Sequence, residues 1–579
     1  MPHYHRVLRR SFCLLLVLCL LAPLAGCAKK QPPVSSTAQP TSAAPTTDTE
    51  FYDPERDTHP YESEYEETEP DDGTEPETEE IPPETEPIPA DVNLGGFAVS
   101  TSTAESTRVG MQILSSGGNA VDAAAAISFM LSVSEPYSSG IGGSGIMLIY
   151  DSKTGKSHTL DYYGCAGSAA NNVDQISVPG LVAGMDEALR RWGTMSLADV
   201  IQPSIDYAEQ GFTVSDAFIY RLTFSDNLRR YNPAFTKLQA GDVLHQYDLA
   251  ETFRKIQSGG ADAFYRGEIA QDIVARSALT MEDLANYQVH VRSTVKTDFA
   301  GWQILGAWGP ASGLTVCQML RVAEMLDIPD PQAAPDDYLR VLNRATTVAY
   351  QSRYSHVVDP EFYKFRTKRY LTDEYLQGRI DTLRSASWTD DPEKECTTQF
   401  AVLDNNGLLV CVTNSLSNSW GSYRCVDGFY LNNALINFSK TGRNAYEPGK
   451  RPRTHFSPTI CLGPNGEMLT IGSPGGVEIP KLIVPVLIDI LRNGTDVQTA
   501  VDKARCFFDS DGYLCLEGED MHPSILNLKE MEGNMYYYSN SHLIFGCTSV
   551  VGYSPSSGIY AVSDQRRDTS LAMVYNFNP

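Results

Sequence analysis

The spacing of apolar residues along this chain changes between a helical pattern and a strand pattern. Residues 104–134 place apolar side chains three or four positions apart and are interrupted by Gly117 and Gly118, which predicts two helices that meet at a glycine turn. Helical periodicity returns over residues 181–212 and 314–352. These regions predict the main helices of the folded body.

Short apolar runs bounded by turn residues predict strands at residues 146–151, 398–404, 408–413 and 467–471. The first run follows a glycine-rich loop at residues 138–145. That loop precedes a strand instead of opening a helix, and the chain has no GxxxxGK(S/T) motif, so a phosphate-binding loop is not indicated. Because helices and strands are interleaved without an internal repeat, the pattern predicts an α/β or α+β body.

A second glycine-rich turn, Gly472 Ser473 Pro474 Gly475 Gly476, separates the last of these strands from an apolar helix expected over residues 479–491. Backbone NH groups at a turn before a helix point outward without helical partners, which suits an oxyanion. The alternative is a tight turn that binds nothing.

The first 27 residues have the pattern of a secretory signal. Arg6, Arg9 and Arg10 precede an apolar run at residues 12–22 that is too short to span a bilayer. The run ends in Leu24 Ala25 Gly26 Cys27, which resembles the lipobox of bacterial lipoproteins. Acylation of Cys27 would anchor the mature chain by lipid alone to the outside of the bacterial cell membrane; the alternative is an ordinary signal with an incidental cysteine.

Residues 28–91 are rich in Pro, Thr, Ser and Glu and carry 19 acidic and 3 basic residues. Such a segment cannot bury enough apolar surface to offset its chain entropy, so we expect a disordered acidic tether. The whole chain has a formal net charge of -27. This charge argues against nucleic acid as a partner, because phosphate binding depends on patches of Lys and Arg.

The cysteines and histidines do not indicate a metal site. Of twelve cysteines, nine remain once the two in the leader and Cys27 are set aside, and they are scattered without a CxxC motif. The histidines of the body show no HExxH motif and no closely spaced ligand pattern. We therefore expect neither a metal ion nor a dense disulfide framework.

The strand that begins Thr397 Thr398 Gln399 Phe400 has a hydroxyl on its first residue and follows an acidic run at residues 390–395, which is typical of an exposed linker. If the bond between Cys396 and Thr397 is cut, Thr397 gains a free amine beside its hydroxyl. A threonine hydroxyl needs a neighbouring base to act as a nucleophile, and an N-terminal amine can be that base. A strand with good β-propensity and no catalytic role is the alternative.

Seven stretches together resemble the gamma-glutamyltransferase family, in family order and over nearly all of residues 95–575. They are GGNAVDAA (117–124), EPYSSGIGGSG (135–145), VPGLVAGM (178–185), FYRGEIA (264–270), TTQFAVLD (397–404), FSPTI (456–460) and GSPGG (472–476).

The resemblance implies an N-terminal-nucleophile hydrolase, a four-layer αββα sandwich that needs no cofactor and cuts itself between Cys396 and Thr397. The products would be a large subunit, residues 92–396, and a small subunit, residues 397–579, which remain associated. By the same resemblance Thr397 is the nucleophile and Ser415 supports it with a hydroxyl where the family has threonine. Gly475 and Gly476 match the pair whose NH groups form the oxyanion hole.

The substrate-binding side departs from the family pattern. Tyr163 aligns with the arginine that holds the glutamate α-carboxylate, although the register there can slip by a residue or two, and Asn437 replaces the acidic partner of the substrate ammonium. The remaining changes are Ala434 for a Glu or Gln, Ser417 for an asparagine, and Thr454 and His455 for a serine pair. Charge-assisted hydrogen bonds contribute about 1.5–3 kcal/mol each, so these changes could cost several powers of ten in affinity for a γ-glutamyl group.

Two arginines, Arg453 and Arg424, are candidates to replace the missing one, and His455 is either a pocket residue or a solvated loop residue. The leading hypothesis is a self-processing amidase that acts on small peptides or γ-glutamyl compounds and transfers the acyl group to water or an amine. A second hypothesis keeps this chemistry with a different acyl group. A third is a non-catalytic surface protein that retains the fold and binds a peptide or wall component.

Overall fold

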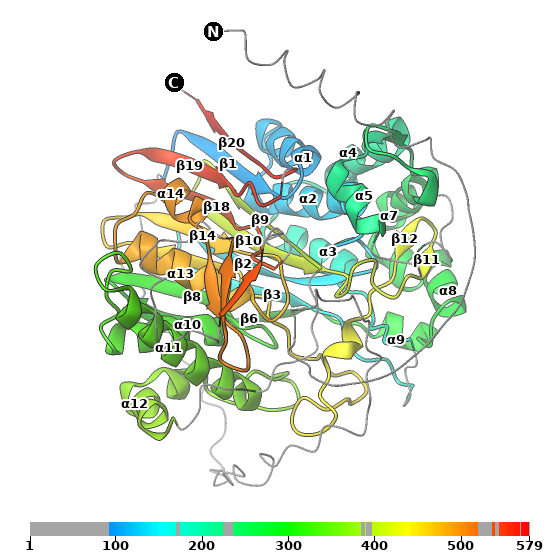
Figure 1. Cartoon of the computed structure of the whole chain (residues 1–579). Helices are drawn as coiled ribbons and strands as arrows, with labels where there is room; N and C mark the ends of the chain where they lie inside the picture. The colour runs from blue at the N-terminus through cyan, green and yellow to red at the C-terminus, as the bar shows by residue number, and fades with distance from the viewer. Residues whose placement is uncertain are drawn as a thin grey trace, which may run out of the picture. The chain divides into compact units, whose positions relative to one another are not determined.

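Two antiparallel β-sheets form the centre of the molecule (Figure 1). In spatial order the first contains β20 (Leu571–Asn576), β1 (Gly96–Thr101), β9 (Thr397–Leu403), β10 (Leu408–Ser415), β2 (Ser144–Asp151), β3 (Lys156–Tyr162) and β6 (His290–Arg292). The second contains β19 (Gly558–Ser563), β18 (Ser549–Ser554), β14 (Met468–Gly472), β13 (Thr459–Leu462), β8 (Trp302–Ala307) and β7 (Thr294–Phe299).

The structure is a computed structural model, and it describes residues 92–169, 174–223, 228, 235–383, 388, 396–518, 535–538, 544–567 and 569–577. The predicted leader with Cys27, the predicted tether and the acidic run at residues 390–395 lie outside these residues.

Helices cover the outer face of each sheet. The first sheet shares a hydrophobic core with α1 (Ala104–Ser115), α2 (Ala120–Ser134), α3 (Leu181–Trp192), α4 (Leu197–Gln210), α5 (Asp216–Thr223), α7 (Tyr247–Tyr265), α8 (Glu268–Ala275) and α9 (Met281–Ala285). The second shares a core with α10 (Gly313–Met325), α11 (Pro335–His356), α12 (Asp373–Thr382), α13 (Ile479–Leu491) and α14 (Val497–Asp502).

Alternating side chains of the central strands place the two sheets face to face. In β9, Phe400 and Val402 belong to the core under α2, while Ala401 and Leu403 point to a separate cluster. That cluster also contains Ile460 of the second sheet, so it is the layer between the sheets. Side chains of a strand alternate between its faces, so each sheet packs against helices on one face and against the other sheet on the opposite face. The result is the αββα sandwich that the family resemblance implies.

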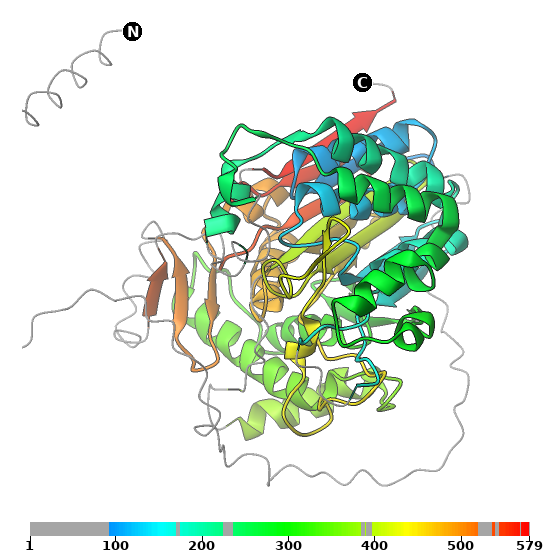
Figure 2. The ribbon, with the colours of Figure 1, turned by 90° about the vertical axis from the view of Figure 1, so that its right-hand side faces the viewer.

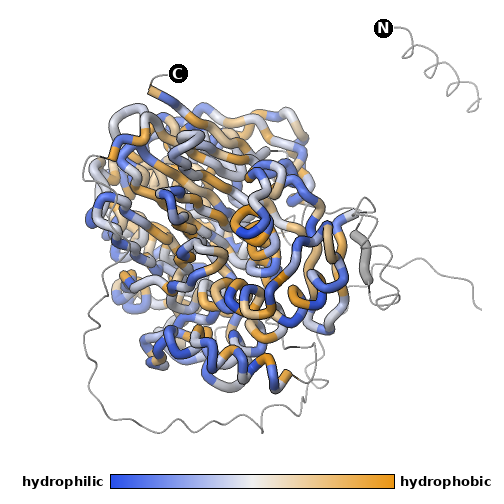
Figure 3. The backbone as a smooth tube through the Cα atoms, turned by 90° about the vertical axis from the view of Figure 1, so that its left-hand side faces the viewer, coloured by the Kyte–Doolittle hydropathy of each residue, from blue (hydrophilic) through white to orange (hydrophobic). Residues whose placement is uncertain are grey.

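Three small sheets lie outside this sandwich. They contain β11 (Cys425–Val426) with β12 (Phe429–Tyr430), β15 (Cys506–Phe508) with β16 (Leu514–Glu517) and β17 (Met535–Tyr538), and β4 (Phe212–Thr213) with β5 (Val243–Leu244). The orange strands at one margin of the body in Figure 2 belong to the second of these sheets. In Figure 3 the hydrophobic, orange segments of the backbone concentrate inside the body, as expected for layers that share buried faces.

The predicted helices and strands are confirmed, with breaks that have local causes. Residues 104–134 form α1 and α2, joined at Gly117, whose φ of 92° is a conformation that glycine adopts without strain. Asn119 then caps α2 by accepting from the NH of Val121 and Asp122. The helical region predicted at residues 314–352 is two helices, because the prolines between residues 329 and 335 interrupt it.

Both predicted subunits contribute strands to each large sheet. In the first sheet β1, β2, β3 and β6 precede Thr397, whereas β9, β10 and β20 begin at or after it. The second sheet combines β7 and β8 with β13, β14, β18 and β19 in the same way. Among the helices that the structure describes, none is long and apolar enough to cross a bilayer.

Candidate active site

Thr397 is the first residue of β9 and is buried, with 1% of its surface exposed. The antiparallel pairing of β9 with β10 places it opposite Ser415, the last residue of β10. Its Oγ1 donates to the carbonyl oxygen of Gly475 at 3.0 Å and lies 3.5 Å from Ser415 Oγ. Pairing of two neighbouring strands therefore brings together the predicted nucleophile and its predicted supporting hydroxyl.

Ser415 also contacts the peptide bond that self-processing would cut. Its Oγ donates to the carbonyl oxygen of Cys396 at 2.5 Å and accepts from the backbone NH of Ser417 at 2.8 Å. A donor on a carbonyl oxygen withdraws electron density from the carbon and stabilises the oxyanion formed on attack. The uncut chain thus holds the Cys396 carbonyl in a polarised state beside the Thr397 hydroxyl.

The side chain of Cys396, the residue before the bond to be cut, is held in the core. Its Sγ donates to the carbonyl oxygen of Tyr137 at 2.9 Å and lies 3.3 Å from Ser138 Oγ. Cys396 is 1% exposed. Both residues of the bond are therefore buried in the uncut chain.

The turn between β14 and α13 brings Gly475 and Gly476 to the nucleophile. Gly475 has a φ of 140°, which a residue with a side chain rarely adopts. Its carbonyl faces Thr397, and the carbonyl of Gly476 accepts from the NH of Ile479 at 3.2 Å. In this turn the group that contacts Thr397 is the Gly475 carbonyl, and because the C=O and NH of one trans peptide point in opposite directions, the Gly476 NH is directed away from Thr397 in the uncut chain. The oxyanion-hole role of Gly475 and Gly476 stays a prediction.

Two further residues contact the start of β9, and the motif analysis assigned no role to them. A guanidinium nitrogen of Arg567 donates to the carbonyl oxygen of Thr397 at 3.0 Å, and the other lies 3.2 Å from Glu135 Oε1. Glu135 opens the motif EPYSSGIGGSG, so the sequence carried a signal for it. Arg567 stands in no quoted motif, and only the folded chain brings it to Thr397.

Tyr163, which the sequence resemblance aligns with the carboxylate-binding arginine of the family, lies in the core. Its side chain is 1% exposed, and its ring packs edge-on against Phe456 with 5.3 Å between centroids. Asn437 Nδ2 donates to its hydroxyl at 3.0 Å. The Tyr163 carbonyl accepts from Tyr287 OH at 2.9 Å and from Arg451 Nε at 3.0 Å. The predicted pair Tyr163 and Asn437 is therefore in direct contact and held on several sides.

Two polar atoms of the predicted pocket are buried without a hydrogen-bond partner among the described residues. They are Asn437 Oδ1 and Ser417 Oγ. Ser417 also has a φ of 79°, an unusual conformation for a residue with a side chain. Strained backbone and unsatisfied polar atoms concentrate at functional sites, so both residues remain candidates for contact with a substrate.

Thr454 and His455 lie in the core, and a solvated loop position for His455 is wrong. His455 is 0% exposed, and its ring stacks on that of Tyr350 with 6.2 Å between the ring centroids. Burial, together with the charges of Arg353, Lys481 and Arg453, holds the pKa of His455 well below its usual range, so the imidazole is neutral at pH 7. The Thr454 carbonyl accepts from Ser312 Oγ at 2.8 Å.

The two arginines considered as replacements have other partners. Arg453 donates to the Tyr354 carbonyl at 2.5 Å and to Ser439 Oγ at 2.8 Å. Arg424 is paired with Asp174 at 2.6 Å. In this structure neither guanidinium group is held ready for a substrate carboxylate.

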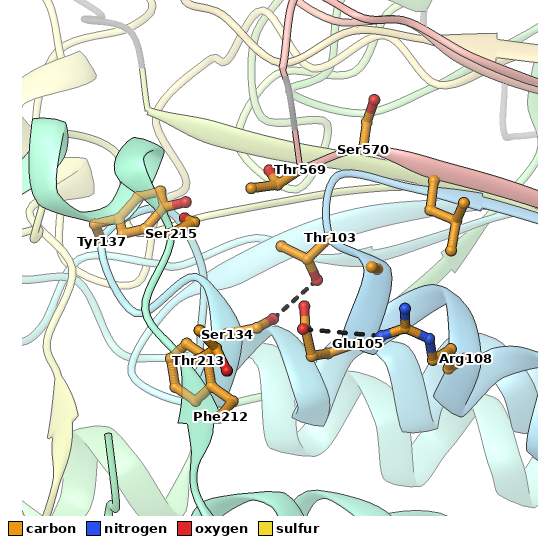
Figure 4. Close-up of a pocket in the computed structure, with 12 residues that line it drawn as sticks. Thr103, Glu105, Arg108, Ser134, Tyr137, Phe212, Thr213, Ser215, Thr569 and Ser570 are labelled. Carbon is orange, nitrogen blue, oxygen red and sulfur yellow. Dashed lines mark hydrogen bonds and ion pairs between the residues drawn. The ribbon is translucent and has the colours of Figure 1, made fainter. Parts of the chain in front are cut away.

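A pocket of about 230 Å³ lies close to this site without including Thr397. Thr103, Ser134, Tyr137, Phe212 and Thr569 are among its lining residues (Figure 4). The pocket is not where the chemistry is expected, because the nucleophile is covered in the uncut chain. Within the described residues no cluster of three His, Cys, Asp or Glu could hold a metal ion, and the nine cysteines there are free thiols.

Comparison with known proteins identifies the family and the fold. The sequence model of the family Gamma-glutamyltranspeptidase matches residues 106–574. A solved structure of cephalosporin acylase from Bacillus halodurans superposes with a TM-score of 0.73 and 23% identity, covering 86% of this chain and 98% of that one. This likeness shows that the two chains share one fold.

Three curated relatives are enzymes made as precursors. Capsule biosynthesis protein CapD proenzyme of Bacillus anthracis is 36% identical, over 72% of this chain and 79% of the relative. Glutathione hydrolase proenzyme of Bacillus subtilis is 29% identical, over 83% of this chain and 91% of the relative. Acylase ACY 1 proenzyme of Pseudomonas sp. strain SE83 is 30% identical, over 72% of this chain and 83% of the relative.

The hydrogen bond from Ser415 to the Cys396 carbonyl predicts how substitutions change self-cleavage. Ser415→Ala removes this donor, and we expect the fragments to form about a hundredfold more slowly, the effect typical of losing one oxyanion donor. Ser415→Thr keeps the hydroxyl and is the matched control, with cleavage close to the unchanged chain. Denaturing electrophoresis over time measures both, with Thr397→Ala as the uncleavable reference. Equal rates for Ser415→Ala and the unchanged chain would contradict the assigned role.

Proposed function

This chain belongs to the gamma-glutamyltranspeptidase family, and on that premise we propose that it is a self-processing enzyme that cleaves γ-glutamyl amide bonds. The acyl group passes through an ester on Thr397 to water or to an amine. One observation supports this proposal above the others. The Thr397 hydroxyl and the carbonyl of the bond to be cut both lie within hydrogen-bonding distance of Ser415 Oγ.

Self-cleavage follows from this arrangement as an N-to-O acyl shift. Thr397 Oγ1 attacks the Cys396 carbonyl carbon, and Ser415 stabilises the negative charge that forms on the oxygen. The carbon–nitrogen bond then breaks, the nitrogen takes up a proton as the amine of Thr397, and Cys396 is left as an ester on the threonine oxygen. Water hydrolyses this ester, which restores the hydroxyl and leaves a carboxylate on Cys396.

Turnover uses the groups that this step releases. The free amine of Thr397 removes the proton of its own hydroxyl, which attacks the substrate amide. The NH groups of Gly475 and Gly476 stabilise the tetrahedral oxyanion, a contribution that is typically about 3–4 kcal/mol for one donor. The leaving amine departs, and water or a second amine takes the acyl group. No step of this sequence requires a metal ion or an organic cofactor.

The two fragments remain associated after cleavage. Strands from both sides of the cut are neighbours in each large sheet: β9 and β10 lie between β1 and β2 in the first, and β13 pairs with β8 in the second. Separating the fragments would expose the buried faces of these strands and leave their backbone groups unpaired, and both changes are strongly unfavourable.

Two kinds of acyl group are candidates for the substrate. The relatives named glutathione hydrolase favour glutamate. A second candidate is an acyl group without an amino-acid head group, and the contact between Tyr163 and Asn437 favours it. By the sequence resemblance this pair stands where the family has an arginine and an aspartate, and its two neutral side chains bond to each other. A relative named Acylase ACY 1 proenzyme also supports the second candidate.

Asn437→Asp tests the choice of acyl group. It restores an acid for a substrate ammonium, so kcat/KM for glutathione should rise about tenfold relative to a neutral acyl amide, in line with one charge-assisted hydrogen bond. Asn437→Ala removes the amide without adding a charge and should not raise that ratio. Steady-state assays with both substrates measure it. Faster turnover of the neutral amide by the unchanged enzyme would favour the second candidate, and binding without turnover of either would favour a non-catalytic surface protein.

We also propose that the enzyme works outside the bacterial cell membrane, held by lipid on Cys27. The support is the sequence Leu24 Ala25 Gly26 Cys27 after a short apolar run, followed by a polar acidic segment of about sixty residues. The segment is long enough to hold the body away from the headgroups, since its like charges favour extended conformations. Two acyl chains on one cysteine would be enough for stable anchoring.

Cys27→Ser tests the anchor. The unchanged protein expressed with its leader should enter the detergent phase when a Triton X-114 extract is warmed, and the variant should stay in the aqueous phase because it carries no acyl chain. Cys165→Ser, a cysteine of the folded body, is the matched control and should partition like the unchanged protein. Aqueous partitioning of the unchanged protein would contradict lipidation.

A further inference from the structure

Among the described residues, the start of β9 has no strand partner on one side. On that side β1 pairs with β9 only from Ala401 to Leu403. Thr397 and Thr398 lie beyond the end of this ladder among the described residues. A backbone carbonyl buried without a partner is costly, so other groups must replace the missing strand at the residue that carries the reaction.

Glu135 supplies one of these groups from the large-subunit side of the cut. It ends α2, and its carboxylate is 0% exposed. Oε2 accepts from Thr398 Oγ1 at 2.6 Å and from Ser102 Oγ at 2.9 Å, and Oε1 accepts from Tyr137 OH at 3.3 Å. A fully buried carboxylate with this many donors has a single orientation, and one donor belongs to the residue next to Thr397.

Arg567 supplies the other group from the small-subunit side. One guanidinium nitrogen bonds to the Thr397 carbonyl oxygen at 3.0 Å, and the other pairs with Glu135 at 3.2 Å. The guanidinium is planar with fixed donor directions, so the ion pair with Glu135 determines where the first nitrogen lies. The ion pair crosses the cleavage site and connects the two fragments at the nucleophile.

We propose that Glu135 and Arg567 act together as a positioning pair that holds Thr397 after cleavage and sets the proton affinity of its liberated amine. This inference rests on the proposed function, because it concerns the base of that reaction. Neither side chain needs to touch the substrate. Both act through Thr397, the first by way of Thr398 and the second by way of the Thr397 carbonyl.

The charges of the pair predict opposite effects on the amine. The carbonyl oxygen and the nitrogen of one residue lie within about 3.6 Å of each other, so the Arg567 cation stands within about 7 Å of the amine. A nearby cation disfavours a second positive charge, so Arg567 lowers the pKa of the amine and keeps it a free base. Glu135 has the opposite sign and raises it.

Other titratable groups face the same corner and are unchanged in the variants below. They are Tyr137, Arg221, Cys396 with the carboxylate created by cleavage, and Cys547. An unperturbed α-amine has a pKa of about 7.7–8.0. The pH range in which activity rises therefore depends on the balance between Arg567 and Glu135.

The test compares Arg567→Gln with Glu135→Gln in the self-cleaved full-length chain. Arg567→Gln removes the cation, so the acid limb of the kcat/KM profile should move to higher pH by about one unit, the lower end of the effect of a close charge. Glu135→Gln removes the anion and should move the limb to lower pH. Arg567→Lys keeps the charge and should restore most of the profile. Rates are divided by the cleaved fraction measured on denaturing gels.

A direct titration of the amine separates this inference from the proposed function. The rate at which a small anhydride acylates the Thr397 amine is followed over pH by mass spectrometry of the N-terminal peptide of the small fragment. This measurement of the amine pKa does not need turnover, so it remains valid even if neither test substrate is cleaved. The same opposite shifts are expected. Identical amine pKa values in both variants, or shifts in the same direction, would overturn the proposal.

A second pair of variants tests the positioning role if a glutamine variant does not fold. If either glutamine variant fails to show the thermal unfolding transition of the unchanged protein, Arg567→Lys and Glu135→Asp replace it, because both keep the charges and change only the reach. The positioning role then predicts a lower kcat with an unchanged acid limb. An unchanged kcat in both of these variants would contradict it.

Discussion

The hydrogen bond from Ser415 to the Cys396 carbonyl depends on how β9 and β10 pair. Thr397 stands opposite Ser415 in the ladder, and the same register sends Phe400 and Val402 to one core and Ala401 and Leu403 to another. A slip of one residue would reverse both faces. The hydrophobic pattern that builds the sandwich therefore also fixes the reacting atoms, and the free energy of folding supports their alignment.

Burial gives this arrangement its chemical character. Thr397, Ser415 and Cys396 are each at most 3% exposed, and hydrogen bonds in such surroundings are stronger than in water because fewer competing dipoles are present. The same burial closes the site in the uncut chain. Cleavage gives the buried Thr397 hydroxyl a neighbouring amine that can act as its base.

Local features of the fold could be predicted from the sequence, whereas contacts between distant segments could not. The glycine turn before α2 and the apolar helix after Gly475 and Gly476 follow from neighbouring residues. The contact of Arg567 with Thr397 joins positions 170 residues apart, and no local pattern encodes it. The same holds for the predicted binding site of the substrate head group. The sequence shows a tyrosine and an asparagine there, but only the folded structure shows that Tyr163 and Asn437 bond to each other.

The most direct test of the account is to determine the N-terminal residue of the small fragment in catalytically active protein. Edman sequencing combined with intact-mass measurement should find a fragment that begins Thr397 Thr398 Gln399 and a large fragment that ends at Cys396. Active protein in which the bond between Cys396 and Thr397 is intact would contradict the account, because the hydroxyl would then lack the amine that activates it.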